Sequence, residues 1–120
     1  MEVQRKRSLG FKLPANTICV NRPLKYGNVY KVVNGGIYGY NSLSKEWVFI
    51  EVADDNYEIA ASRAIALFDE YIHGRPHLLI PCPYTVEDIK RELKGKNLAC
   101  FCPVGSPCHR QILIKIANGA

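Results

Sequence analysis

The hydrophobic positions of this 120-residue chain fall into short runs with a two-residue period, and these runs predict several strands. Asn16–Asn21 alternates β-branched and polar residues and predicts a first strand. Lys31–Val52 keeps the same period around Gly35-Gly36 and predicts a small antiparallel excursion of two or three strands. Leu98–Cys102 is a short apolar run of the kind found in buried strands.

Between and after these strands, apolar residues recur at helical spacing. Ile59–Ile72 predicts the longest helix, with an N-cap in Asp54-Asp55-Asn56 and an end at His73-Gly74. Val86–Leu93 predicts a second helix, because Thr85 is a good N-cap and acidic residues precede basic ones along it. A third helix is expected from Cys108 to Asn118. The apolar run Leu78–Ile80, followed by prolines, predicts an extended link.

This order of elements predicts an α/β fold. Asn16–Asn21 and Leu98–Cys102 are separated by helical crossovers, so we expect them to pair in parallel. The expected architecture is a small three-layer-like sheet with parallel core strands, helical crossovers and an antiparallel β excursion. Residues 13–120 are long enough for a single α/β domain. Residues 1–12 are expected to be a basic N-terminal arm, which suits either polyanion binding or a solubilising tail.

The distribution of apolar residues predicts an intracellular protein. No apolar run reaches the length of a membrane span, and the N-terminus lacks the apolar centre of a secretory signal, so we expect a cytoplasmic protein with no membrane partner. The five cysteines are an odd number and cluster as Cys-x-Cys followed by Cys-His. That spacing favours a metal site or reactive thiols over a secreted disulfide framework.

The predicted topology brings cations and thiols together. Ligands of parallel sheets bind beyond the carboxyl ends of the strands, and a helix N-terminus favours an anion. The formal charge of +5 agrees with an anionic partner. We therefore expect a pocket for a phosphate-bearing small molecule or a nucleic acid. Its predicted ligand-binding residues are Arg22, Lys25, Asn28 and Arg110, and in an enzymatic version Cys108 is the nucleophile and His109 the acid or base.

Two other interpretations use the same residues. The first is a zinc site formed by Cys100, Cys102, Cys108 and His109, for which the ligand types are suitable. The spacing is poor for zinc unless the chain bends at Cys102, because extended residues two apart hold their sulfurs too widely. The second is structural: the cysteines pack in the core and the protein acts through its surface as a host-interaction factor.

Four aromatic residues in the antiparallel excursion have a two-residue period. This pattern favours core and cross-strand packing, with a base-stacking platform as the alternative. The residues are Tyr38, Tyr40, Trp47 and Phe49.

Several motifs resemble those of a small domain family of unknown function found in phages and bacteria. They are Asn21-Arg-Pro with Gly27-Asn28, the central helix, Leu98-Ala-Cys-Phe-Cys102, and Cys108-His109. Val29 stands where the family pattern has proline, and the tyrosine-rich excursion is similar to a lineage-specific insertion. The resemblance implies these motif positions and a phage context, in which the protein would act in the host cytoplasm, but it implies no reaction.

Overall fold

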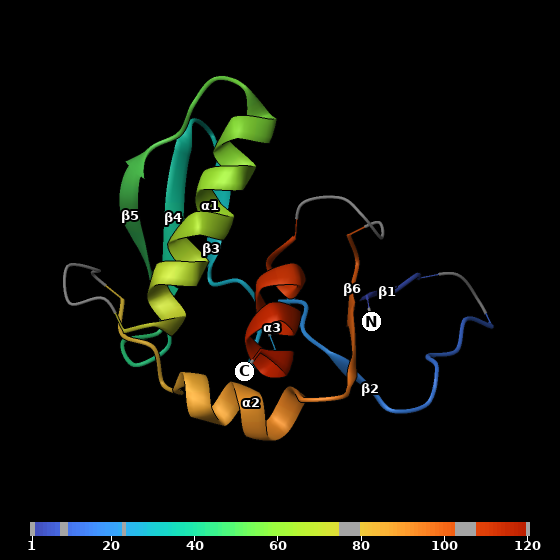
Figure 1. Ribbon diagram of the computed structural model, residues 1–120. Helices are drawn as coiled ribbons and strands as arrows, with labels where there is room; N and C mark the ends of the chain where they lie inside the picture. Colours follow the sequence, from blue (N-terminus) through green and yellow to red (C-terminus); the bar gives the residue numbers. More distant parts are fainter. Residues whose placement is uncertain (1, 8–9, 23, 75–79, 103–107, 120) are drawn as a thin grey trace. The chain divides into compact units, whose positions relative to one another are not determined.

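The computed structural model describes residues 2–7, 10–22, 24–74, 80–102 and 108–119. The chain divides into two compact units, each with its own sheet and helix or helices (Figure 1). Unit 1 comprises Met1–Gly27 and Val86–Ala120, and unit 2 comprises Asn28–Thr85. Unit 2 is therefore an insertion in the sequence of unit 1.

The sheet of unit 1 is parallel, as the sequence predicts. Its order is β1 (Glu2–Gln4), β6 (Asn97–Cys100), β2 (Thr17–Cys19), with β6 in the centre. Ile18 lies opposite Leu98, and Val3 lies opposite Ala99. Strands β2 and β6 are shorter than the predicted runs. Strand β1 was not predicted, and it falls within the expected basic arm.

Two helices complete unit 1 at the predicted positions. Helix α2 spans Val86–Leu93 and α3 spans His109–Asn118, and the two helices contact each other. Helix α3 also contacts β6 and β1. The apolar side chains of both helices meet in a core whose most buried members are Ile89, Leu93, Leu98 and Leu113. This core fixes the start of α3 relative to the end of β6.

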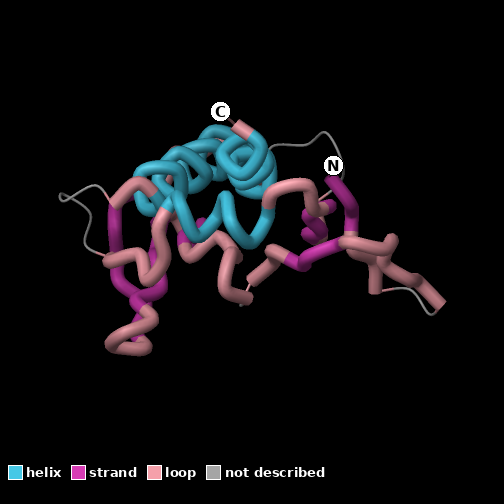
Figure 2. Tube along the Cα trace, turned by 60° about the horizontal axis from the view of Figure 1, so that its bottom comes forward, coloured by secondary structure: helices cyan, strands magenta, loops and turns pink. Residues whose placement is uncertain are grey.

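Unit 2 is the antiparallel excursion covered by one helix. Strands β3 (Tyr30–Val33), β4 (Gly36–Asn41) and β5 (Glu46–Val52) follow in that order across the sheet. Helix α1 (Tyr57–Ile72) begins at the predicted N-cap, where the Asn56 side chain accepts from two backbone N–H groups. It lies against one side of this sheet (Figures 1 and 2). Its buried residues are Ala60, Ala64, Leu67, Phe68, Tyr71 and Ile72.

The aromatic stripe of this sheet lies on the side away from the core. Tyr38 packs edge-to-face on Phe49, and Tyr40 packs in the same way on Trp47, which confirms cross-strand packing. The prediction that these rings belong to the core is wrong, because Trp47 is 44% exposed and Phe49 is 51% exposed. Strand alternation explains the difference: Tyr30 and Ile37, on the opposite face, are the positions that are buried.

Two remaining predictions concern membrane-spanning helices and the link Leu78–Ile80. No helix in the described ranges is long and apolar enough to cross a membrane. Of the predicted link Leu78–Ile80, the first two residues lie outside the described ranges, and Ile80 is buried in unit 2.

Candidate metal centre

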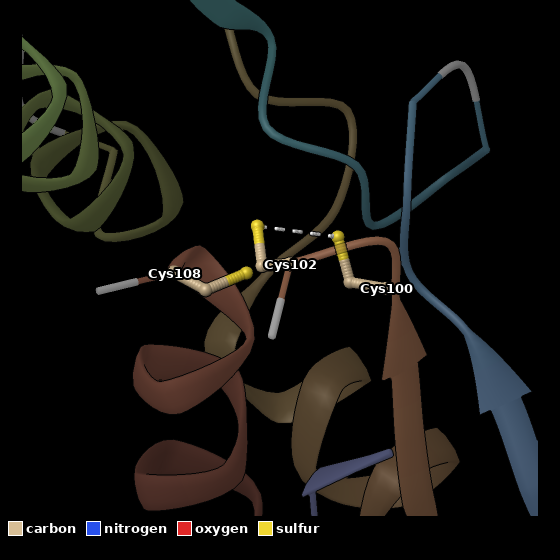
Figure 3. Close-up of side chains that lie close together, drawn as sticks. All are labelled: Cys100, Cys102 and Cys108. Carbon is tan, nitrogen blue, oxygen red and sulfur yellow. Dashed lines mark hydrogen bonds between the residues drawn. The ribbon is translucent and has the colours of Figure 1, made fainter. Parts of the chain in front are cut away.

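Three cysteine sulfurs of unit 1 converge at the carboxyl end of β6. The Sγ atoms of Cys100, Cys102 and Cys108 all lie within 4.8 Å of one another, and those of Cys100 and Cys102 are 4.0 Å apart (Figure 3). Sulfurs bound to one tetrahedral zinc at about 2.3 Å would be separated by about 3.8 Å. Small side-chain shifts would therefore bring all three sulfurs onto one ion.

The backbone explains how residues with poor formal spacing reach one point. Strand β6 ends at Cys100, and Phe101 and Cys102 form a bend, so the two sulfurs are not held apart by extended backbone. Cys108 is the N-cap of α3 in an extended conformation and lies outside the helix. The objection to the zinc spacing assumed regular extended structure at a position where the chain leaves it.

Arg110 stabilises the bend at Phe101 and Cys102 through hydrogen bonds to the backbone. Its side chain is fully buried and donates to the carbonyl oxygens of Cys100 (3.4 Å) and Cys102 (3.1 Å). It also donates to the Val3 carbonyl (2.7 Å) and to Glu2 Oε1 (2.9 Å), which ties β1 to the same point. The sequence predicts a ligand-binding role for Arg110, and that role stays a prediction. In the structure the guanidinium contacts Glu2 and backbone carbonyl oxygens on both sides of Phe101, which is a positioning role.

The two ring nitrogens of His109 have different neighbours, the Cys108 thiol and the backbone just after β2. Nε2 lies 2.6 Å from the Val20 carbonyl oxygen, and Nδ1 lies 3.6 Å from Cys108 Sγ. Burial lowers the pKa of His109, which favours the neutral ring. Since a carbonyl can only accept, the hydrogen of the neutral ring belongs on Nε2, and Nδ1 presents its lone pair to the thiol. Val20 is a site contributor that no side-chain pattern could reveal.

The three thiols share their protons unequally. Hydrogen bonding from Cys108 lowers the pKa of Cys100 to about 5. The same contact raises the pKa of Cys108, and burial raises the pKa of Cys102. These shifts favour the thiolate form at Cys100 over Cys102 and Cys108. A bound cation would stabilise the others as well.

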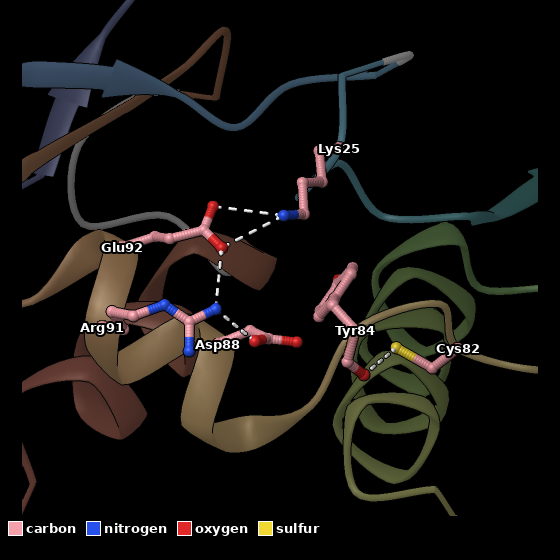
Figure 4. A network of polar contacts seen from close by, with 6 residues as sticks. All are labelled: Lys25, Cys82, Tyr84, Asp88, Arg91 and Glu92. Atoms are coloured by element: carbon pink, nitrogen blue, oxygen red, sulfur yellow. Dashed lines mark hydrogen bonds and ion pairs between the residues drawn. The ribbon is translucent and has the colours of Figure 1, made fainter.

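Three of the predicted anion-binding residues have contacts with residues other than the three cysteines. The charge of Arg22 is close enough to His109 to lower the pKa of the ring further. Lys25 contacts Glu92 of α2, with both carboxylate oxygens 3.1 Å away (Figure 4). Asn28 belongs to unit 2, where its side chain accepts from the backbone N–H of Tyr30.

The remaining two cysteines are not members of the cluster. All five cysteines lie in the described ranges, and none forms a disulfide. Cys19 is on β2, and Cys82 is in unit 2, where its thiol donates to the Tyr84 carbonyl oxygen (Figure 4). They offer matched thiols for comparison with the three clustered ones.

Comparison with known proteins places residues 3–119 in one family. No curated protein and no solved structure matches the chain. A family model matches residues 3–119, which include the Cys-x-Cys bend, Cys108-His109 and both units. The chain therefore belongs to the family described as a domain of unknown function (DUF4326).

Proposed function

We propose that this protein is a zinc-binding domain whose site is formed by the thiolates of Cys100, Cys102 and Cys108. The convergence of the three sulfurs within 4.8 Å is the observation that carries the proposal. Thiolates with a nearby imidazole are ligands that zinc prefers. The neutral Nδ1 of His109, fixed by the Val20 carbonyl, would supply the fourth ligand after a small ring movement, which would close the site and make it structural.

Metal content of the purified, untagged protein tests this proposal. We expect inductively coupled plasma mass spectrometry to find about one equivalent of zinc per chain. Cys100→Ser, Cys102→Ser and Cys108→Ser should each lower zinc retention, because each removes a thiolate from the cluster. Cys19→Ser and Cys82→Ser are the matched controls and should retain it.

Two outcomes would overturn the zinc site. One is a wild-type protein that takes up no metal after refolding with zinc. The other is equal metal loss in the control variants and the cluster variants. Substitution with cobalt then tests His109, because the visible spectrum of the cobalt protein should change in His109→Asn if the imidazole is a ligand.

A phosphate-bearing small ligand is a second candidate function, favoured by the position of Arg22 near His109 at the start of α3. In its enzymatic version the Cys108 sulfur would attack a phosphorus atom and displace the oxygen of the leaving group. His109 Nδ1, 3.6 Å from that sulfur, would accept the thiol proton and return it to the leaving oxygen. Cys108 is only 2% exposed, so a substrate would have little access to its sulfur, which argues against a nucleophilic role. A rise in melting temperature with inorganic phosphate or a nucleotide, lost in Arg22→Ala, would support this candidate, and no rise with either would remove it.

A further inference from the structure

The two units of the chain differ sharply in charge. Unit 1 contains 12 of the 16 lysines and arginines and 4 of the 11 acidic residues, whereas unit 2 contains 4 and 7. The net charge of +5 is thus +8 in unit 1 and −3 in unit 2. A polyanionic partner is therefore expected to contact unit 1.

Part of this positive charge is held at a fixed place by the backbone. Strand β1 pairs with β6, and the pairing continues past the strand because Arg5 N–H donates to the Cys100 carbonyl at 2.7 Å. The Arg5 guanidinium donates to the buried Asn21 side chain at 2.9 Å. The beginning of the basic arm is thereby attached to the carboxyl end of the parallel sheet.

Phe101 forms a platform for two of the cations. The guanidinium carbon of Arg7 lies 4.0 Å from the centre of the Phe101 ring, and that of Arg5 lies 5.0 Å away. Stacking on an aromatic ring orients a guanidinium while its N–H groups stay available at the edge. Arg7 is exposed, so its donors face solvent. Arg22 follows β2 at the same end of the sheet.

Three of the four acidic residues of unit 1 form ion pairs with other cations. Glu2 pairs with Arg110, Asp88 pairs with Arg91, and Glu92 pairs with Lys25. Arg5 and Arg7 follow β1, and Arg22 follows β2, so their backbones leave strands that lie on either side of the central strand, two strand spacings or roughly 10 Å apart. We call Arg5, Arg7 and Arg22 the cationic edge. A row of cations of this length suits successive phosphates better than a single one.

We propose that the cationic edge binds the phosphate backbone of a nucleic acid. Binding of this kind reads charge and is independent of base sequence. The inference rests on the charges and contacts of unit 1 and does not require that the cysteine cluster hold metal.

Fluorescence anisotropy with labelled 20-nucleotide single-stranded and duplex DNA tests the proposal across a salt series. For the wild-type protein, the logarithm of the dissociation constant should rise linearly with that of the salt concentration. Arg7→Gln and Arg22→Gln should each lower the slope by about 0.7 on single-stranded DNA and weaken binding by about fivefold at 0.1 M salt. Both side chains are exposed, so both variants should keep the wild-type melting temperature.

Lys45→Gln and Lys115→Gln are matched controls, since each removes one positive charge elsewhere. Lys45 is in unit 2, and Lys115 is in the last turn of α3, at the opposite end of that helix from Cys108. Both should leave the slope and the affinity unchanged. The proposal fails if the wild-type protein does not bind at low salt, or if a control variant loses as much affinity as Arg7→Gln. Metal content, measured on every sample, separates this failure from failure of the zinc site.

Discussion

At the scale of single residues, the buried arginine has the largest structural consequence. Arg110 stands in the first turn of α3, where the helix dipole disfavours a cation. It is tolerated because Glu2 and three carbonyl oxygens surround its guanidinium. That unfavourable position in the sequence was the one available signal that Arg110 has an internal partner.

Replacement of Arg110 should therefore destabilise the protein strongly. We expect Arg110→Met to lower the free energy of unfolding by about 3 kcal/mol, because it leaves a carboxylate and several carbonyls without their donor. Arg110→Lys should recover only part of the loss, since lysine cannot reproduce the forked geometry. The measurement is urea unfolding.

An exposed ion pair provides the control for this prediction. Arg91 also pairs with acidic residues of its own helix, Asp88 and Glu92, but its side chain is 66% exposed (Figure 4). Arg91→Met should lower the free energy of unfolding far less than Arg110→Met does, because solvent screens an exposed ion pair. Similar costs at Arg91 and Arg110 would contradict the positioning role of the buried guanidinium.

At the scale of elements, regular periodicity was informative and short irregular segments were not. The bounds of α2 agree with the prediction, and α1 starts at the expected cap, because apolar spacing and capping residues are local signals. Strand β1 has three residues, too few for a two-residue period to stand out, and its identity depends on pairing with β6. The bend that gathers Cys100 and Cys102 likewise depends on tertiary contacts with Arg110.

Truncating an aromatic ring should cost more unfolding free energy in the core of unit 2 than on the exposed face of its sheet. Phe68, on α1, is fully buried, so Phe68→Ala should cost about 3–5 kcal/mol of unfolding free energy. Phe49, half exposed on β5, loses mainly its edge-to-face contact with Tyr38, and Phe49→Ala should cost about 1 kcal/mol. Thermal or urea unfolding of the two variants checks the difference. Equal costs would mean that the aromatic face is covered in solution.

At the scale of the whole molecule, charge and chemistry are concentrated in the same unit. The clustered thiols, His109 and the cationic edge all belong to unit 1, whose sheet has three short strands. Unit 2 has the longer strands and the longest helix, with a core of its own around Phe68 and Tyr71. A small sheet of this kind gains most from a cross-link, and three thiolates on one ion would join the end of β6 to the start of α3.

Metal removal should consequently affect the two units differently. With a zinc chelator, or in Cys100→Ser, we expect amide hydrogen exchange to accelerate in β6 and α3 because the link between them is lost. Exchange in α1 and β4 should change little, since their hydrogen bonds and apolar contacts lie within unit 2. Mass spectrometry of peptides from both units measures this difference in exchange. Cys82→Ser is the control and should leave exchange in β6 and α3 unchanged. Uniform acceleration across both units would show that they unfold as one, and unchanged exchange in β6 would show that the cluster contributes nothing to the stability of unit 1.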